Sequence, residues 1–476
     1  MSSGPGVDPL FWIVAAAVAL FATVLVSCRP FVGACLLTIL YPFTTGMLVL
    51  TTPPHHVLKV FGVNLLSVVL LAALLVRRVF VWRGGCRDGV AGRIPDFPRI
   101  LFFMAGFSAC AFLSLQWADN AFLSFLGFLR FGGNFVIVLF LAVFVDDHKK
   151  LVRLLVLNCC VSAVFIAAAI FATYHAFHWE HSIILTPDFS LVLDFSLFNQ
   201  PGGFRDIVVG LLTGYGLSGK HELGMLMMGC IFFSLFLITQ NRSTAVNGLL
   251  GMLILLCCSM IYQGFAKLTV VSVFFIIVAG TLSVPQWRRK IPEVLFVFLL
   301  VNASGFLIAT TLKTQHMKAM ETTGSKLAIA ADSGEFTVGS MSERKRIWRL
   351  ALDRIGQSQG MGTGADSLER DATFGYHHGH NLFLSFAAEY GIAGLACIVA
   401  LLGTVVNRAR ITLFRDIRPD DLAWRLVFVG LGAVLAAWME SLFDVYIWLP
   451  HLWYFLGILL ASLKLASASK PPPIAA

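Results

Sequence analysis

The sequence is poor in charge. Only 13% of its 476 residues are Asp, Glu, Lys or Arg, whereas 58% are hydrophobic. A soluble protein of this length could not bury so much apolar surface, so the composition excludes a soluble globular fold. Many apolar runs extend over about 20 residues, the length that a helix needs to cross a bilayer. We therefore predict an all-α, polytopic integral membrane protein.

Signals of several other classes are also missing. The N-terminus lacks a basic segment and a small-residue cleavage site, so the apolar run 11–27 is interpreted as a retained helix and not as a signal peptide. None of the ten cysteines lies in the two long polar loops, which argues against disulfides and zinc sites. The net charge of +9 comes from short loops between apolar runs, so it does not indicate a nucleic-acid partner.

Hydropathy predicts one membrane domain over residues 1–476 with about 12–13 transmembrane helices. The candidate spans are 10–27, 31–50, 58–76, 100–116, 124–145, 151–173, 222–239, 244–262, 267–284, 293–312, 381–406, 424–446 and 451–467. Short loops rich in Lys and Arg, such as 77–93 and 408–418, fall on one face if the spans alternate, and that face is expected to be cytoplasmic. The opposite face then carries two long loops, about 174–221 and 313–380.

The second long loop ends at a histidine. His380-Asn381 stands at the junction with a long apolar run, and nine residues separate it from Gly391-x-x-Gly394. On a continuous helix both glycines fall within about 40° of His380, so we expect a small-residue stripe against which another helix packs. A histidine at this junction can reach both water and a lipid-borne substrate. The alternative is an interfacial histidine that only anchors the helix end.

The pattern H-N-x9-G-x-x-G after a long loop resembles the signature of the O-antigen ligase and polysaccharide polymerase superfamily. Three further segments are similar to motifs of that superfamily: Arg344-x-x-x-Trp348 with Gly360–Gly364, Gly219-Lys220-His221-Glu222-Leu223-Gly224, and Ala266-Lys267-Leu268-Thr269. The last two resemble succinoglycan-type exopolysaccharide polymerases most closely. His221 and Ala266 depart from the Asn and Ser that are usual there.

The resemblance implies a glycosyltransferase of the bacterial inner membrane with its active site on the periplasmic side. It would polymerise undecaprenyl-pyrophosphate-linked oligosaccharide units into exopolysaccharide by inverting, metal-independent transfer, without a cofactor. The implied catalytic residues are His380, Arg344 and Lys267, and the implied substrate-binding residues are Lys220, His221, Asn381, Arg205 and Arg346. Candidate partners are the lipid-linked glycans, the bilayer, a chain-length regulator and export machinery.

These residue types suit that chemistry. A pyrophosphate leaving group develops negative charge, which Arg344 can clamp with two hydrogen bonds while Lys220 and Lys267 act as point charges. A neutral histidine can serve as general base at neutral pH. Each residue also has a structural alternative: Arg344 can belong to a solvated basic face, Lys267 can reach outward from a helix end, and Lys220 can be an ordinary loop residue.

Two other activities stay open. A ligase would transfer the lipid-linked glycan to lipid A-core or to protein. A flippase or ion-coupled transporter would use intramembrane charges, and Glu440 and Asp444 lie on one helical face. A transporter, however, predicts a two-fold repeat of hydropathy, which the sequence lacks. Arg130 lies within an apolar run and is expected to face the protein interior.

Overall fold

A computed structural model of the chain defines the fold. It describes residues 9–42, 48–52, 56–60, 62–83, 94–175, 179–186, 189–195, 220–263, 336–365, 367–370, 381–416, 421–443 and 450–468, together with a few positions between 273 and 303.

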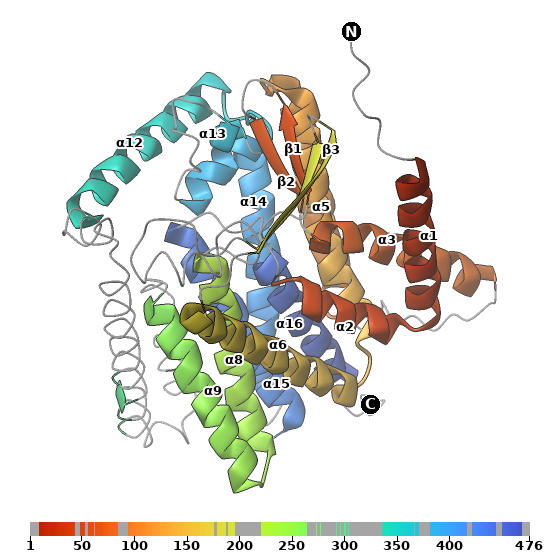
Figure 1. The fold of residues 1–476 in the computed structure, drawn as a ribbon, viewed down its shortest axis with the longest axis vertical. Coiled ribbons are helices and arrows are strands. Elements are labelled where there is room, and N and C mark those ends of the chain that lie inside the picture. Colours follow the sequence, from red (N-terminus) through yellow and green to blue (C-terminus); the bar gives the residue numbers. More distant parts are fainter. Residues whose placement is uncertain are drawn as a thin grey trace, which may run out of the picture.

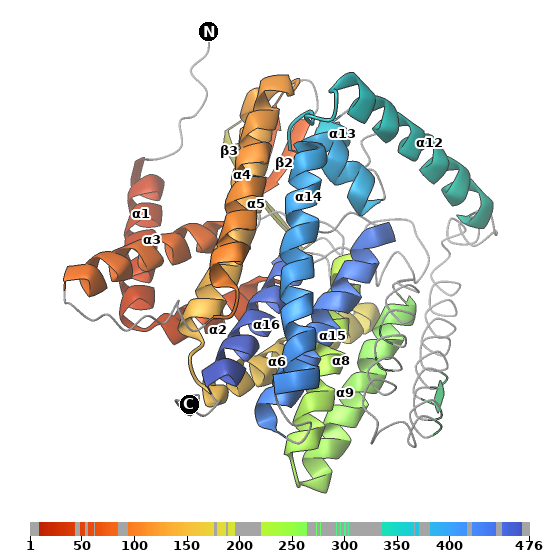
Figure 2. The same ribbon diagram turned by 180° about the vertical axis from the view of Figure 1, so that it is seen from behind.

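Helices dominate the described chain (Figures 1 and 2). They are α1 (Pro9–Cys28), α2 (Pro30–Leu40), α3 (Gly62–Arg83), α4 (Phe97–Leu113), α5 (Ala121–Phe144), α6 (His148–His175), α8 (Lys220–Gln240), α9 (Thr244–Gln263), α12 (Phe336–Gln357), α13 (Ser367–Arg370), α14 (Leu382–Ile411), α15 (Leu422–Phe443) and α16 (Pro450–Ala468). Within these described residues, six helices are long and apolar enough to cross a membrane. The prediction of a polytopic helical membrane protein is confirmed.

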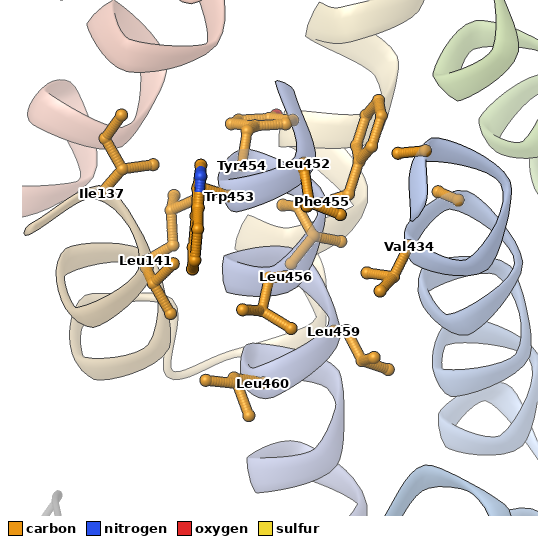
Figure 3. Packing of buried hydrophobic residues seen from close by; sticks show 14 of the residues in the cluster. Ile137, Leu141, Val434, Leu452, Trp453, Tyr454, Phe455, Leu456, Leu459 and Leu460 are labelled. Atoms are coloured by element: carbon orange, nitrogen blue, oxygen red, sulfur yellow. The ribbon is translucent and has the colours of Figure 1, made fainter. Parts of the chain in front are cut away.

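Helix α16 forms the centre of the bundle, with every residue from Pro450 to Ala466 buried. Figure 3 shows it between α5 and α15. On the α5 side, the Trp453 ring meets the edges of Phe131 and Phe135, with both centroid distances at 5.3 Å. A helix that is apolar on all sides is stable only where other helices or lipid surround it, and here other helices surround it.

Hydrogen bonds between helix ends show which ends lie together. Arg425 at the start of α15 donates to Thr239 O near the end of α8 (3.1 Å), and Trp424 Nε1 donates to Leu413 O beyond the end of α14 (2.9 Å). These ends lie at the bottom of Figure 1. Basic residues gather at this same end of the bundle: Lys149 and Lys150 in the first turn of α6, Arg242 between α8 and α9, and Arg408 and Arg410 in the last turn of α14.

A buried lysine closes the lower end of α5. Lys464 of α16 is 3% exposed, and its Nζ donates to Ala142 O (2.6 Å) and Val143 O (2.9 Å). The last carbonyls of a helix have no partner within the helix, so an ammonium group stabilises them by hydrogen bonds and by charge. The contact also joins α16 to α5.

Replacing Lys464 by methionine is expected to lower the free energy of unfolding by about 1–3 kcal/mol, because it removes the donor from two carbonyls at the end of α5, one buried and one partly buried. Denaturant unfolding in detergent micelles measures the change. The control is Lys150→Ala, which removes a more exposed ion pair with Asp146 (2.6 Å) and should cost about 1 kcal/mol or less. Equal effects of the two substitutions would contradict the capping role of Lys464.

The structure adds a small antiparallel sheet to the helices. Its strands are β1 (Leu48–Thr52), β2 (His56–Val60), β3 (Trp179–Thr186) and β4 (Phe189–Phe195), in the order β2-β1-β4-β3. Two hairpins, β1–β2 and β3–β4, join where Val49 and Leu50 pair with Ser190 and Phe189. The sheet lies beside the upper ends of α5 and α14 in Figure 1. The sequence predicted only a loop at β3 and β4.

The span predicted over 31–50 is wrong in its second half. Helix α2 ends at Leu40, and β1 begins at Leu48. Pro42 follows the C-cap residue Tyr41, and proline cannot donate the hydrogen bond that would continue the helix. The residues of β1, Leu-Val-Leu-Thr-Thr, are largely β-branched and favour a strand. The spans predicted over 267–284 and 293–312 lie almost entirely outside the described residues.

Candidate active site

Helix α14 is not continuous. Gly391 has φ 78° and ψ 167°, so the helix is broken into a short segment, Leu382–Tyr390, and a longer one that begins at Ile392. The prediction of one continuous helix is therefore wrong, and the projection that placed Gly391 and Gly394 on the same face as His380 does not hold. Gly394 nevertheless packs closely on α4, because a Cβ atom there would lie 3.4 Å from Cys110 Cβ.

Asn381 caps the short segment. Its backbone is extended (φ −158°, ψ 120°), and its side-chain oxygen accepts a hydrogen bond from Leu384 N at 3.1 Å. Asparagine is among the residues most favoured at this position because it satisfies one of the unpaired amides of the first turn. The residue before the cap, His380, therefore precedes the helix and lies outside the described residues.

A distant loop replaces the hydrogen bonds that are lost at the break in α14. In a continuous helix Ala388 O would accept from Ile392 N, and Glu389 O would accept from Ala393 N. Instead, Ala388 O accepts from Thr363 N (2.8 Å), Glu389 O accepts from Gly364 N (2.9 Å), and Ile392 N donates to Gly360 O (2.9 Å). The loop Gly360–Gly364 thus bonds to both sides of the break, which leaves these buried groups satisfied.

The glycine loop and the break in α14 approach each other so closely that only glycine fits at positions 362 and 391. Gly362 has φ 89°, and a Cβ atom there would lie 2.5 Å from Gly391 N and 2.6 Å from Glu389 O. A Cβ atom on Gly391 would lie 2.7 Å from both Gly360 O and Met361 O. These are contacts between two backbones, which cannot rotate away as a side chain can. The hydrogen bonds across the break require this close approach.

Side chains extend the contact between α12 and the short segment of α14. Ile347 and Ala351 of α12 form a buried cluster with Leu368 of α13 and Ala388 of α14. The end of α12 also approaches the turn between α4 and α5, where Arg354 and Asp119 form an ion pair at 3.9 Å. Ser124 of α5 donates to Ala365 O at 3.2 Å, just after the glycine loop. Helix α12 and the loop that follows it are therefore joined to the turn before α5, to α5 itself and to the short segment of α14.

Residues 228–399 match the family model of the O-antigen ligases. The chain carries an O-antigen ligase family domain. This ligase-family domain includes α12, the glycine loop and the short segment of α14, so both partners of the backbone contact lie within it. Such a domain implies ligase-type or polymerase-type transfer of a lipid-linked glycan. No curated protein matches the chain.

The structure locates only some of the site residues that the sequence predicted. Within the ligase-family domain, Asn381 caps α14, while Arg344 and Arg346 lie in α12. Lys220 and His221 form the start of α8 and precede the domain. His380, Lys267 and Arg205 lie outside the described residues. Of these residues, Arg344 and Arg346 on the one hand and Asn381 on the other thus belong to two helices, α12 and α14, that pack against each other.

The start of α8 lies on the same side of the protein as the end of α9. The end of α8 contacts the start of α15, which in turn contacts the chain just beyond the end of α14. Helix α9 returns antiparallel beside α8 and ends at Gln263, close in sequence to Lys267 (Figure 1). Lys220 at the start of α8 and Gln263 at the end of α9 therefore lie on one side of the protein.

Aromatic rings pack on the short segment of α14, and several ionisable side chains of the bundle are buried. Phe131 of α5 packs against Phe386 and Tyr390 of the short α14 segment, with both ring centroid distances at 5.8 Å. The neighbouring Arg130 is 8% exposed, which confirms the prediction that it faces the protein interior. Glu389 and Glu440 are also buried, at 9% and 1% exposure. Buried ionisable side chains need interaction partners, and Arg130, Glu389 and Glu440 are all engaged in interactions.

A second buried polar cluster escaped the sequence analysis. His451, near the start of α16, is fully buried, and neither ring nitrogen has a hydrogen-bond partner within the described structure. Its ring meets Tyr41 edge to face at 5.1 Å, and Tyr41 OH accepts a hydrogen bond from Asn158. Tyr41 also stacks on Tyr454, whose hydroxyl pairs with Thr38 at 3.0 Å. A histidine that follows Pro450 in an apolar run was the available signal.

Replacing Asn381 by alanine is expected to destabilise the start of α14 by about 0.5–2 kcal/mol, because the cap to Leu384 N is lost. Asn381→Ser retains a capping oxygen and should cost a few tenths of a kcal/mol at most. Hydrogen exchange of the first-turn amides of α14 measures the change. Equal protection in the alanine and serine variants would contradict the capping role.

Proposed function

We propose that this protein is an inner-membrane polymerase that joins undecaprenyl-pyrophosphate-linked oligosaccharide units into an exopolysaccharide. The ligase-family domain supports transfer of a lipid-linked glycan, and the contact between the glycine loop and α14 carries the assignment of the site. That contact holds the helix of Arg344 against the segment that follows His380. Cationic groups and a base held near each other are what transfer from a pyrophosphate donor requires.

In the proposed reaction, His380 accepts the proton of an acceptor sugar hydroxyl as that oxygen attacks the anomeric carbon of the donor. The bond between this carbon and the pyrophosphate oxygen breaks on the opposite side, so the configuration inverts. The pair of electrons leaves with the lipid pyrophosphate, and Arg344 and Lys267 stabilise its negative charge. No metal is needed if these cations take that role.

The substrate-binding roles are assigned to Lys220, His221, Asn381, Arg205 and Arg346. The location of α8 supports Lys220 and His221, because their helix begins on the same side as the end of α9, which is close in sequence to Lys267. Arg346 is exposed on α12, where phosphate or sugar groups can reach it. Asn381 uses its side-chain oxygen for the cap, and its Nδ2 amide group can still donate to a sugar hydroxyl.

The proposed orientation places this site on the periplasmic side. Lys149, Lys150, Arg242, Arg408 and Arg410 lie at the opposite end of the bundle, and short cytoplasmic loops are rich in Lys and Arg. We propose that residues 313–380 form a large extracytoplasmic loop over the site. Substrates carried on a membrane lipid would then enter from the outer leaflet.

The polymerase is preferred to a ligase because Lys267 and the segment 219–224 resemble polymerase motifs. The test reconstitutes the protein with a purified lipid-linked repeat unit and, in a parallel sample, adds lipid A-core. A ladder of longer lipid-linked chains in both samples supports polymerisation. Product that appears only with lipid A-core overturns the polymerase and supports the ligase.

A further inference from the structure

The break at Gly391 leaves the helical segment that follows His380 with little support from its own helix. The segment Leu382–Tyr390 is only about two and a half turns long. No helical hydrogen bond joins Ala388 O to Ile392 N, because each of these groups is bonded to the glycine loop. The direction of the segment, and with it the position of the residue before Asn381, therefore depends on contacts from outside the helix.

Side chains of α5, α12 and α13 pack on the segment, and the glycine loop supplies hydrogen bonds to it. Thr363 supplies the only side chain among the described hydrogen bonds from this loop to α14. Thr363 is 8% exposed. Its backbone N–H and its Oγ1 both donate to Ala388 O, at 2.8 Å and 3.1 Å. The Thr363 hydroxyl also lies 2.7 Å from Ser367 Oγ of α13, so it joins the short segment to α13 as well.

We infer that Thr363 is a positioning residue for glycosyl transfer, and that it acts by fixing the short segment of α14 that follows His380. This inference rests on the proposed function. The glycine loop follows directly after α12, the helix that carries Arg344, and is hydrogen-bonded to α14. We therefore infer that the loop fixes the distance between the proposed cation and the proposed base. A small displacement of a base from its acceptor hydroxyl lowers the rate far more than it lowers substrate binding.

A residue that only stabilises the fold would behave differently. Replacing such a residue would lower the amount of folded protein. It would also lower the rate by the same factor in the wild type and in a variant that lacks His380. A positioning residue acts through the base, so its loss changes kcat and has no further effect once the base is gone. This difference can be measured in a double-mutant cycle.

The experiment compares Thr363→Val, Thr363→Ser and Ser367→Ala with the wild type in proteoliposomes that contain a lipid-linked repeat unit. Valine removes the hydroxyl while keeping the shape, and serine keeps the hydroxyl. Ser367→Ala removes the contact to Thr363 but leaves the bond to Ala388 O. We expect Thr363→Val to lower kcat about tenfold with little change in KM for the donor. Thr363→Ser and Ser367→Ala should stay near the wild-type rate.

The cycle repeats Thr363→Val in a His380→Ala background. The double variant should be no slower than His380→Ala alone. The inference is overturned if Thr363→Ser lowers kcat as much as Thr363→Val does. It is also overturned if the factors by which Thr363→Val and His380→Ala lower kcat multiply in the double variant, or if the loss of rate matches a loss of folded protein. If His380→Ala has wild-type turnover, the proposed base is wrong. In that case the glycine loop still positions another reacting group if Thr363→Val lowers kcat and Thr363→Ser does not. The loop has no such role if both variants keep the wild-type kcat.

Discussion

Replacing His380 by alanine is expected to lower the rate of glycosyl transfer about 10²–10⁴-fold, the usual effect of removing a general base. The protein should still insert and fold, because Asn381 provides the cap of α14 and the residue before it lies outside the helix. Initial rates of chain elongation in proteoliposomes measure the effect. The rate of the wild type should also fall as the pH drops below the range in which histidine is neutral, since a protonated imidazole cannot accept a proton.

The matched control for this substitution is His378→Ala. His378 lies in the same loop, two positions before His380, and has no role in the proposed mechanism. Its replacement should leave the rate and the acid limb unchanged. If His380→Ala keeps the wild-type rate, or if both variants lose activity equally, His380 is not the general base.

Replacing Gly362 by alanine is expected to lower both activity and stability. The added Cβ would lie 2.5 Å from Gly391 N, 2.6 Å from Glu389 O and 2.8 Å from Tyr390 C, at a backbone φ of 89°. Since all three atoms belong to a backbone, the loop must move away and lose its hydrogen bonds to Ala388 O and Glu389 O. We expect destabilisation of about 3 kcal/mol or more and a rate at least about 10²-fold lower.

Gly356→Ala is the control for the glycine loop. Gly356 lies in α12 a few residues before the loop, and a Cβ atom there meets no atom within 4 Å. Alanine should leave activity unchanged and stabilise the helix by up to about 1 kcal/mol, because alanine loses less backbone entropy than glycine. Thermal unfolding in detergent, combined with elongation rates, measures both variants. A fully active and stable Gly362→Ala protein would contradict the described contact between the loop and α14.

The start of the candidate site could be predicted from local sequence. An asparagine before a long apolar run is typical of an N-cap, and the span predicted from residue 381 begins as a helix at Leu382. The interior location of Arg130 was equally predictable, because a charge in lipid would be far less stable. Both inferences depend only on residues near in sequence and on the apolar setting.

The break in α14 could not be predicted in this way. Gly391-x-x-Gly394 is typical of a packing stripe, and Gly394 does pack closely on α4. Gly391 leaves the helix because a loop about thirty residues earlier provides the alternative hydrogen bonds. The signal was the three glycines within Gly360–Gly364, which favour positive φ and a close backbone approach but do not identify the partner.

The most direct test separates glycosyl transfer from transport. Purified protein is incorporated into sealed vesicles that contain one lipid-linked repeat unit, and the lipid extract is analysed by mass spectrometry over time. The proposed glycosyl transfer predicts lipid-linked chains that lengthen by whole repeat units, with release of one undecaprenyl pyrophosphate for each unit added. Repeat units that cross the bilayer while every lipid-linked chain keeps its original length would contradict it.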